Sequence, residues 1–559
     1  MYSKSPNYRI LREILSKMRR MDYSKEISYL VIYTFLYKYA SHHLKSYLLQ
    51  YLEKRPITLD EAFSDESERE NLKQESLYMF GFFINNPDYF MDDVMNTSYS
   101  DRFFVHKFVE AFSKHVEFLE GSNHEKYFNF IFNAVKSGIN FNKFEFEGEN
   151  HLIVKDLIYS ISKLDVSAED YTYEFVFDKI CQSRILRLDQ DPEYISQLMA
   201  ALVNSAKPAP VDIYNPFLND GSALIYYMMF HPLIKTTCGR GFDEITHCAC
   251  ITKLFMYNFH LENVFLEFSS PFDAINADSS TYDVIISKIP AMTSRNLRKL
   301  NKSQNVEMVK RNKRKQLENL LADSFDFKKD SFAIDDELSS SLDTLLDRMD
   351  LEKRPQLEFS GEYKSLENSE YLFLLNLIDA LKDDGIMVLT MSQSFLFKNS
   401  LETMRKYLTV EKNYIDAIIS IPDELSRTKN SEIVVVFRKN KSCDDIVFID
   451  LSKNYAAEPS SHAVSGLFRR NLILSDKTLN NIVNVYNQRQ TVDKFSNVVD
   501  LRKLSENEFN LSVSRYVDTF EGEFISLSQL KEDKKDIDVN LRRLNKKIDL
   551  MMEDLKIRF

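Results

Sequence analysis

The sequence predicts an α/β fold with a doubly wound sheet, and three observations predict it. Short apolar runs with the character of buried parallel strands recur along the middle of the chain. Stretches with apolar residues at helical spacing lie between these runs, and turn-forming residues separate the two kinds of segment. In order, the strand, turn, helix, strand, helix and strand lie at residues 211–214, 215–221, 223–230, the run ending at 241–242, 245–261 and 282–287. Ligands of such sheets bind at the carboxyl ends of the strands, so we expect the functional residues there.

Length and composition limit the class of protein. A chain of 559 residues predicts two or three domains, and 44% hydrophobic residues are enough to form their cores. The mean hydropathy of −0.33 predicts a soluble protein. A net charge of −12 argues against a protein that wraps DNA without a basic partner or a local basic patch. The 11 glycines argue against several phosphate-binding loops.

The cysteines and the N-terminal residues indicate the cellular compartment of the protein. Five cysteines at spacings unlike a disulfide framework favour a reducing cytoplasm. Residues 1–20 are polar and charged, so we expect no signal peptide, and the longest apolar run, residues 29–36, is too short to span a bilayer. Three of the candidate metal ligands, His247, Cys248 and Cys250, lie on a predicted core helix without a second ligand pair. We therefore interpret them as buried side chains and expect no metal site.

The chain divides into three predicted regions. Residues 1–165 carry apolar residues at three-to-four spacing and predict a helical N-terminal domain. Residues 166–475 contain the α/β core, interrupted by a charged insertion at residues 292–366. Residues 476–559 form a C-terminal region that ends in a patterned helix.

Two turns at the carboxyl ends of predicted strands carry the candidate site. The first turn covers residues 215–222, and the second turn covers residues 287–291 and reads Ser-Lys-Ile-Pro-Ala. Asp243 lies at the carboxyl end of a third predicted strand. The sheet topology is expected to bring these three places to one edge.

This order of segments resembles the core of S-adenosylmethionine-dependent methyltransferases. More narrowly, it is similar to the modification (M) subunits of type I restriction–modification systems, which are adenine-N6 DNA methyltransferases. The resemblance covers roughly residues 165–559. Five later segments follow the second half of that family's sheet and the start of its C-terminal region: residues 370–397 (EYLFLLNLIDALKDDGIMVLTMSQSFLF), 404–425 (MRKYLTVEKNYIDAIISIPDEL), 431–441 (SEIVVVFRKNK), 446–453 (IVFIDLSK) and 509–517 (FNLSVSRYV).

The resemblance implies a cofactor, S-adenosylmethionine, and residues that would hold it. The residues that align with the family's cofactor positions are Asn215, Pro216 and Gly221 in the first turn, Asp243 as the acid for the cofactor ribose, and Asp273 near the cofactor adenine. Glu244 follows Asp243 directly, so either acid could face the ligand. Both Asp243 and Asp273 could also be solvent-facing acids at strand ends.

The first turn departs from the family pattern, which reads Asp-Pro-x-x-Gly-Ser-Gly. Asn215 replaces the aspartate, Asn219 places a side chain where glycine allows close approach of a ligand, and Asp220 adds a negative charge. Upstream, where the family has Gly-Glu-Phe-Tyr-Thr-Pro, residues 187–192 keep only the proline. These changes predict weakened cofactor binding.

The second turn departs from the family's Ser-Asn-Pro-Pro-aromatic motif. The catalytic-turn positions are Ser287, Lys288 and Pro290, and Lys288 stands where the family has asparagine. An asparagine can accept a hydrogen bond from the amino group of the target adenine, whereas a lysine ammonium only donates. Ala291 replaces the aromatic ring that would stack on a flipped base. We therefore expect little or no methyl transfer.

The insertion begins with a basic run. Its candidate DNA-binding residues are Arg295, Arg298, Lys310, Arg311, Lys313 and Arg314. One interpretation is a phosphate-contacting loop or helix, and the other is a solvated charged surface. Residues 323–350 are acidic and could fold back on the basic run.

The C-terminus carries a heptad pattern. The stripe consists of Leu527, Leu530, Ile537, Leu541, Leu544, Ile548, Met551 and Leu555. Its apolar residues must be covered, either by the chain's own domain or by a partner helix. The resemblance implies the specificity subunit as that partner, and the family also assembles with a restriction subunit.

Three functions remain open. The leading prediction is an M-subunit-like scaffold or regulatory subunit that associates with DNA and is catalytically impaired. The second is an active adenine-N6 DNA methyltransferase with an unusual site. The third is a protein-interaction module without a nucleic-acid role. We place the N-terminal helices either in the clamp on DNA that the resemblance implies or in a plain helical bundle.

Overall fold

The computed structural model describes residues 5–20, 25–53, 55–141, 149–183, 186, 188, 193–207, 211–230, 235–257, 261–269, 281–289, 369–421, 432–451, 457–459, 472–519 and 527–554. The chain forms two compact units, Met1–Val517 and Asp518–Phe559, which are described separately.

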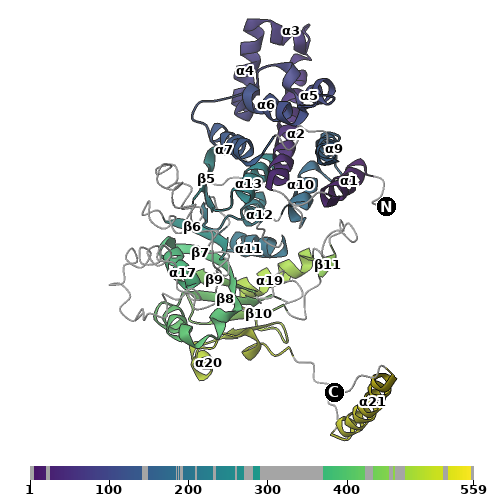
Figure 1. Cartoon of the computed structure of the whole chain (residues 1–559). Coiled ribbons are helices and arrows are strands. Elements are labelled where there is room, and N and C mark those ends of the chain that lie inside the picture. The colour runs from purple at the N-terminus through teal and green to yellow at the C-terminus, as the bar shows by residue number, and fades with distance from the viewer. Residues whose placement is uncertain are drawn as a thin grey trace, which may run out of the picture. The chain divides into compact units, whose positions relative to one another are not determined.

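Helices predominate in the N-terminal part of the first unit, as the apolar spacing predicts (Figure 1). They are α1 (Pro6–Arg20), α2 (Lys25–Leu52), α3 (Leu59–Ser64), α4 (Glu66–Phe80), α5 (Met91–Ser98), α6 (Phe104–His115), α7 (Asn123–Gly138), α9 (Glu149–Ser162), α10 (Tyr173–Gln182) and α11 (Glu193–Ala206). A short antiparallel pair, β1 (Phe82–Ile84) and β2 (Val116–Phe118), lies among them. The sequence did not predict this pair.

Helix α2 is the centre of the helical region. Every residue from Ile27 to Ser41 is buried, which is expected of a helix that is hydrophobic on all sides. Its tyrosines use their hydroxyl groups as polar anchors within this core. Tyr33 donates to the carbonyl oxygen of Val109 at 2.6 Å, and Tyr39 donates to that of Met256 at 2.5 Å.

The helical region also covers one edge of the sheet. Strand β5 (Val264–Phe268) is the last strand in the sheet order, so one side of its backbone has no strand partner among the described residues. The hydroxyl of Tyr127 in α7 donates to the carbonyl oxygen of Val264 and accepts from the amide of Leu266 at 2.8 Å. This side chain therefore satisfies backbone groups that an edge strand leaves unpaired.

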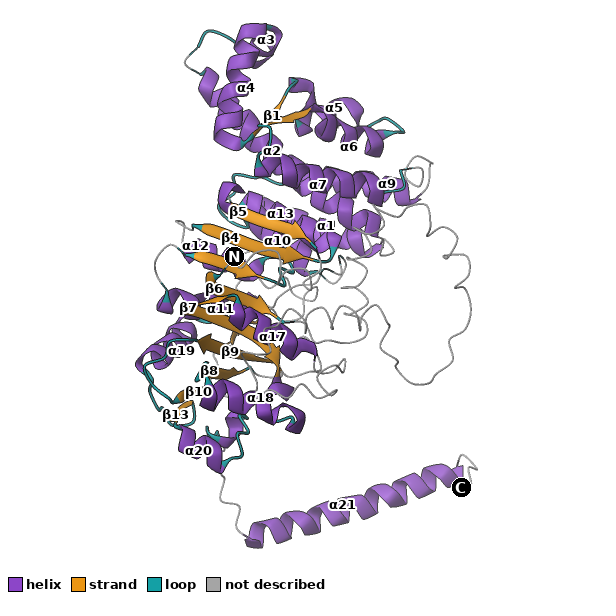
Figure 2. Cartoon of the chain, turned by 90° about the vertical axis from the view of Figure 1, so that its left-hand side faces the viewer, coloured by secondary structure: helices purple, strands orange, loops and turns teal. Residues whose placement is uncertain are grey.

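A nine-stranded sheet forms the centre of the first unit (Figure 2). Its order is β13-β10-β8-β9-β7-β6-β3-β4-β5. Strands β9 and β13 run antiparallel to their neighbours, and the other pairs are parallel. Besides β5, the strands are β3 (Asp212–Asn215), β4 (Thr236–Gly241), β6 (Tyr282–Lys288), β7 (Leu381–Ser392), β8 (Ile415–Ser420), β9 (Glu432–Arg438), β10 (Ile446–Asp450) and β13 (Ser496–Val499). The doubly wound α/β prediction is confirmed.

Helices cover both faces of this sheet (Figure 2). On one face, side chains such as Ile213 and Val284 join the core of α11, α12 (Ser222–Phe230), α13 (Glu244–Met256) and α19 (Asp476–Gln488). On the other face, alternate side chains such as Ile285 pack with α17 (Ser369–Asp379), α18 (Glu402–Lys406) and α20 (Leu501–Glu506). Burial on both faces explains why the strands read as continuous apolar runs in the sequence.

Two details differ from the sequence-based expectation. Residues 383–385 read Asp-Asp-Gly, a sequence typical of a tight turn, but they lie within β7. The register between β6 and β7 shifts from Tyr282↔Leu381 to Val284↔Ile386, so these residues belong to an irregularity in the strand. Strand β13 lies beyond residue 475, where the core was expected to end, and pairs with β10.

A further two-stranded sheet joins β11 (Ala457–Pro459) and β12 (Leu472–Leu474). Short helical turns lie at η2 (Pro87–Tyr89), η3 (Leu261–Asn263), η6 (Gln393–Leu396), η7 (Asn399–Leu401) and η9 (Val513–Arg515), and η8 (Tyr407–Glu411) is a π-helical turn. Among the described helices, none has a stretch long and apolar enough to cross a lipid bilayer.

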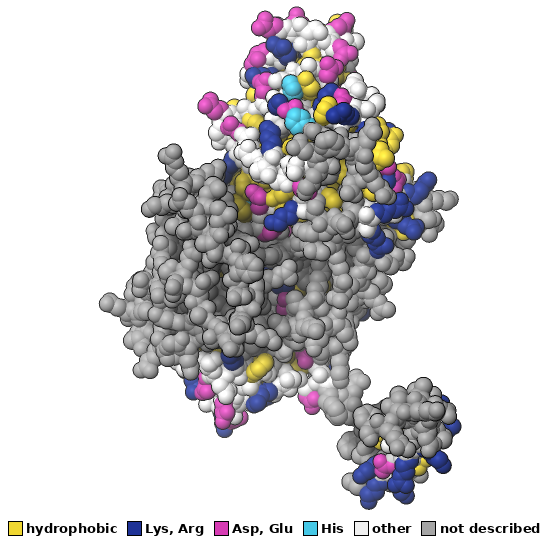
Figure 3. Space-filling model, in the orientation of Figure 1, with side chains coloured by type: hydrophobic (Ala, Val, Ile, Leu, Met, Phe, Trp, Pro, Cys, Tyr) yellow, Lys and Arg dark blue, Asp and Glu magenta, His cyan; other side chains and the backbone are white. Residues whose placement is uncertain are grey.

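The second unit contains one long helix, α21 (Leu527–Asp554), which confirms the helix predicted from the heptad pattern. Four residues of the stripe are about half exposed or more: Ile537 (60%), Leu541 (51%), Leu544 (57%) and Ile548 (51%). Residues 534–548 also carry six basic and two acidic side chains. Figure 3 shows basic side chains gathered on this helix with hydrophobic ones among them.

Candidate functional site

The first and second turns meet at the point where the strand order reverses. The chain runs outward from β3 to β4 and β5, and β6 then returns to the other side of β3. Asn215 ends β3 and Ser287 lies near the end of β6. The Ser287 hydroxyl donates to Oδ1 of Asn215 at 2.8 Å. This is the position at which doubly wound sheets bind their ligands.

Asn215 presents one unused donor at this junction. Its Oδ1 also accepts from the backbone amide of Phe217 at 3.1 Å, which fixes which way the side-chain amide faces. The residue is fully buried, and its Nδ2 has no hydrogen-bond partner among the described residues. A buried unpaired N–H is costly, so this atom suits an acceptor group on a ligand, such as a carboxylate.

The first turn keeps a tight backbone in spite of its changed residues. Asn219 adopts a left-handed conformation with φ 45°, which asparagine tolerates better than most residues. Gly221 has φ 76°, and a Cβ atom there would lie 2.4 Å from Sγ of Cys250. The amide of Leu218 donates to the carbonyl oxygen of Arg240 at 2.9 Å and ties the turn to β4. The glycine that aligned with the family motif therefore has a steric role.

Asp220 does not place a free charge on the turn. Its carboxylate is 1% exposed and accepts from Nζ of Lys253 in α13 at 2.8 Å and from the Ser222 hydroxyl at 2.8 Å. Lys253 also pairs with Asp178 at 2.9 Å. Burial alone would lower the pKa of Lys253, but the two carboxylates outweigh it and raise the pKa well above its usual value. Lys253 therefore compensates the charge that Asp220 adds to the turn, and the expected weakening of cofactor binding stays a prediction.

The two acids at the end of β4 have different partners. Asp243 caps the N-terminus of α13, and its Oδ1 accepts from the amide of Thr246 at 2.9 Å and from the Thr246 hydroxyl at 2.6 Å. Glu244 accepts from the hydroxyl of Tyr29 in α2. Glu244 is therefore bonded to α2, whereas Asp243 is bonded within the first turn of α13.

Lys288 forms an ion pair across the sheet. Its Nζ lies 2.9 Å from Oε1 and 3.1 Å from Oε2 of Glu432, the first residue of β9. The two side chains are 17% and 11% exposed. An ammonium has donors only, so the Lys288 side chain offers no acceptor to an adenine amino group.

Several predicted site residues lie outside the described residues. They are Pro290 and Ala291 of the second turn, Asp273, the upstream positions 187 and 189–192, and the basic residues Arg295, Arg298, Lys310, Arg311, Lys313 and Arg314. Their roles stay predictions. Cys248 and Cys250 are buried in α13, in agreement with the interpretation that they are core residues.

Sequence reasoning missed two residues of this site. Lys253 carried a signal, because a lysine in an otherwise apolar helix must have a buried counter-charge. Glu432 carried none, because 144 positions separate it from Lys288 and the pairing depends on strand order. The fold and the turn geometry thus define a protein with a methyltransferase-type sheet and a changed second turn.

Comparison with known proteins agrees with this class. The family model for N-6 DNA methylases matches residues 344–523. The chain is 23% identical to the type I restriction enzyme MpnII methylase subunit of Mycoplasma pneumoniae over 98% of this chain and 96% of that protein. It is 30% identical to the MjaVII methylase subunit of Methanocaldococcus jannaschii over 35% and 33% of the two chains.

A solved structure shares the fold over nearly the whole chain. The type I restriction–modification methyltransferase subunit from Streptococcus thermophilus aligns with a TM-score of 0.67 at 18% identity, over 92% of this chain and 99% of that one. The chain is thus similar to type I restriction–modification methylase subunits over nearly its whole length, and residues 344–523 match the N-6 DNA methylase family.

Proposed function

We propose that the protein is an M-subunit-like scaffold or regulatory subunit that associates with DNA and has lost efficient methyl transfer to adenine. The observation that carries this proposal is the ion pair between Lys288 and Glu432. It occupies the position at which the family resemblance implies an adenine-accepting asparagine. Restoring an acceptor requires breaking a pair in which both side chains are less than one-fifth exposed.

In this proposal, the chain retains the residues that would bind the cofactor. Asn215, Gly221 and Asp243 would hold S-adenosylmethionine, the cofactor that family homology implies in general. The support is the left-handed backbone at Asn219, the steric need for Gly221, the neutralised Asp220 and the unused Nδ2 of Asn215. The cofactor would supply the methyl group, and the chain's own residues would position the acceptor base. Lys288 does not support this positioning of the acceptor base.

The direct test is transfer of a tritiated methyl group to adenine in duplex DNA. The full chain is assayed alone and with its specificity partner, and cofactor binding is measured in parallel by calorimetry. We expect cofactor binding without measurable transfer. Transfer to adenine by the unaltered chain would refute the proposal.

An active adenine-N6 methyltransferase is the second candidate, and the retained shape of the first turn favours it. The double variant Lys288→Asn/Glu432→Gln separates the two candidates, because it supplies the acceptor and leaves no buried carboxylate unpaired. If the wild-type chain is inactive and the variant gains transfer, impairment lies at this ion pair. If the variant loses a wild-type activity, Lys288 contributes to an unusual active site.

For DNA, the proposal relies on the basic run at residues 295–315. Charge reversal of Arg311, Lys313 and Arg314 is expected to weaken DNA association and to reduce its salt dependence. Unchanged association would favour the third function, a protein-interaction module.

For the protein partner, we propose a specificity-type subunit that covers the apolar stripe of α21. The support is the half-exposed Leu541, Leu544 and Ile548 and the basic flanks of the helix, which favour an apolar partner helix with acidic flanks. Leu541→Asp is expected to abolish co-purification with that subunit. Val539→Asp is the matched control, because Val539 is 62% exposed and lies off the stripe. Equal loss in both variants would contradict docking through the stripe.

A further inference from the structure

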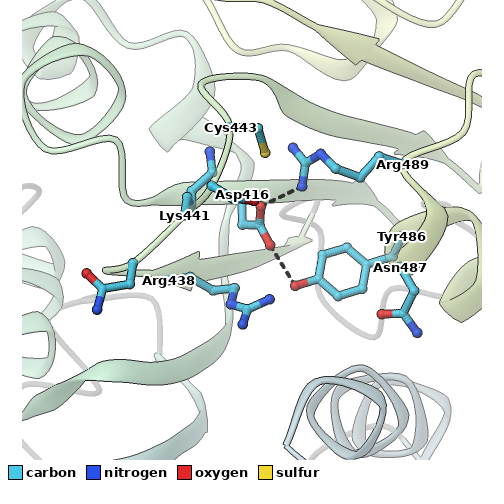
Figure 4. A pocket seen from close by; sticks show the side chains of 9 residues that line it. Asp416, Arg438, Lys441, Cys443, Tyr486, Asn487 and Arg489 are labelled. Atoms are coloured by element: carbon cyan, nitrogen blue, oxygen red, sulfur yellow. Dashed lines mark hydrogen bonds and ion pairs between the residues drawn. The ribbon is translucent and has the colours of Figure 1, made fainter.

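A polar cavity lies among β8, β9, the loop after β9 and the end of α19 (Figure 4). It has a volume of about 250 Å³. Asp416 near the start of β8, Arg438 at the end of β9 and Arg489 after α19 contribute to its wall, with Lys441 from the loop between β9 and β10. Because β9 runs antiparallel to β8, its carboxyl end lies at the amino edge of the parallel strands.

A buried carboxylate holds one side of the cavity. Asp416 is 3% exposed and accepts from the Tyr486 hydroxyl at 2.7 Å and from Nη1 of Arg489 at 2.8 Å. Arg489 also donates through Nη2 to the carbonyl oxygen of Asp445 at 2.7 Å and pairs with the Asp445 carboxylate. Its Nε is buried without a hydrogen-bond partner among the described residues. The acids of this wall are therefore already paired, while one arginine donor is not.

Lys441 places a fixed cation at the cavity. Its Nζ donates to Oδ1 of Asn413 at 3.0 Å and to the backbone oxygens of Ile415 at 2.7 Å and Asp445 at 2.9 Å. Burial lowers the pKa of Lys441, but three acceptors require all three ammonium hydrogens and hold the charged form in place. These three acceptors are uncharged, so they hold the Lys441 ammonium in place without neutralising its positive charge.

Arg438 adds a second cation without a carboxylate partner in the described part of the chain. Its backbone amide is anchored to the carbonyl oxygen of Tyr414 at 2.8 Å, and Figure 4 shows its guanidinium on the Tyr486 side of the cavity. The asparagine, serine and cysteine side chains of the wall add uncharged polar groups, including Cys443. The lining therefore favours a small anion that accepts several hydrogen bonds.

We propose that this cavity binds a phosphate group, either as inorganic phosphate or on a small phosphate monoester. The Arg438 guanidinium would donate hydrogen bonds to phosphate oxygens, and the Lys441 ammonium, whose hydrogens already bond to the protein, would add positive charge. The cavity is smaller than the range of roughly 300–1,000 Å³ in which drug-sized ligands bind, so the ligand is small. The site lies at the opposite edge of the sheet from the first and second turns, so its occupancy is separable from methyl transfer.

The first experiment measures binding of sodium phosphate, adenosine monophosphate and adenosine to the full chain by calorimetry. We expect phosphate and the monophosphate to bind and adenosine not to bind. Tighter binding of the monophosphate identifies a monoester site, and equal or tighter binding of phosphate identifies an inorganic phosphate site. Absence of binding for both phosphates, or equal binding of adenosine, would overturn the proposal.

Variants locate the binding in this cavity. Arg438→Gln is expected to weaken phosphate binding about tenfold, the effect of losing one charge-assisted hydrogen bond. Arg438→Lys keeps the charge and is expected to lose less. The control is Arg502→Gln in α20, which removes the same charge from a side chain that is 87% exposed. A thermal melt verifies folding. Equal losses for Arg438→Gln and Arg502→Gln would contradict the site.

Cys443 provides an independent measure of occupancy. It lines the cavity and is partly exposed, as is Cys238 in β4, whereas Cys181, Cys248 and Cys250 are buried. Bound phosphate is expected to slow alkylation of Cys443, and Cys443→Ser identifies the signal. Phosphate binding with no change in that rate would place the ligand elsewhere. Binding of an oligonucleotide duplex through Arg438 without binding of free phosphate would also overturn the proposal.

Discussion

The first and second turns lie side by side at the sheet edge, but they differ from the family pattern in different ways. In the first turn, Asn219 and Asp220 replace a glycine and a serine, yet the backbone remains tight and Lys253 balances the added charge. In the second turn, Lys288 replaces an asparagine and pairs with Glu432. The first turn has different residues but keeps a tight backbone conformation. In the second turn, a hydrogen-bond donor stands where the family has an acceptor.

The two turns therefore differ in what a substitution must preserve, namely the backbone conformation in the first and the hydrogen-bonding group in the second. A left-handed backbone position accepts asparagine as well as glycine, and a buried acid is tolerated where a lysine can reach it. A donor cannot replace an acceptor in the same geometry. We therefore expect the first turn to tolerate changes that keep its shape, and the second turn to depend on which atoms it presents.

The largest expected effect tests how the first turn is held. Lys253→Met leaves the buried Asp220 and the partly buried Asp178 without their shared cation, and we expect the free energy of unfolding to fall by about 3–5 kcal/mol. Urea denaturation measures the change. Lys235→Met is the control, because Lys235 is 68% exposed and its partner Asp212 keeps Lys382 at 3.0 Å. Its cost should be below about 1 kcal/mol. A loss in Lys253→Met as small as that in Lys235→Met would contradict the role of Lys253 in holding the first turn.

A somewhat smaller effect is expected from Gly221→Ala. The new Cβ would require φ 76° and would meet Sγ of Cys250 at 2.4 Å, so strain and overpacking add to a loss of about 2–4 kcal/mol. Gly121→Ala is the matched control, because Gly121 has φ 73° with nothing within 4 Å of a Cβ. That variant should lose only the cost of the backbone conformation, about 1–2 kcal/mol. Equal losses in thermal melts would show that Gly221 has no packing role.

The ion pair of the second turn should show a moderate coupling. In a double-mutant cycle of Lys288→Met and Glu432→Gln, we expect a coupling energy of about 1–2 kcal/mol, between the values for exposed and buried pairs. The double variant should therefore cost about 1–2 kcal/mol less than the sum of the two single variants. Additive effects in chemical denaturation would mean that the pair does not hold the second turn.

The smallest effect is expected at Asn219. Asn219→Gly keeps φ 45° accessible and should change the free energy of unfolding by less than about 0.5 kcal/mol. Asn219→Ala should cost about 1 kcal/mol, since alanine disfavours this conformation. If cofactor binding measured by calorimetry is unchanged in Asn219→Gly, the asparagine side chain does not obstruct the first turn. A loss larger than that of Asn219→Ala would contradict the conformational explanation.

Much of the fold could be predicted because its signals are local. Buried strands such as β8 and β9 appear as apolar runs, and the heptad stripe predicted α21 directly. The candidate residues Asn215, Ser287 and Asp243 were predicted at the carboxyl ends of strands, where the structure places them. The extended start of β7 was missed because its Asp-Asp-Gly sequence is typical of a turn, and its pairing with β6 overrides that tendency.

The sequence by itself determined which residue types are present at the two turns, and hence that Lys288 cannot accept a hydrogen bond. It also determined the alternation of strands and helices, because hydrophobic periodicity is a property of neighbouring positions. The tertiary structure decided where the charges of Asp220 and Lys288 are balanced. Lys253 and Glu432 are 33 and 144 positions away from them, and ion pairs at such separations depend on strand order and helix packing.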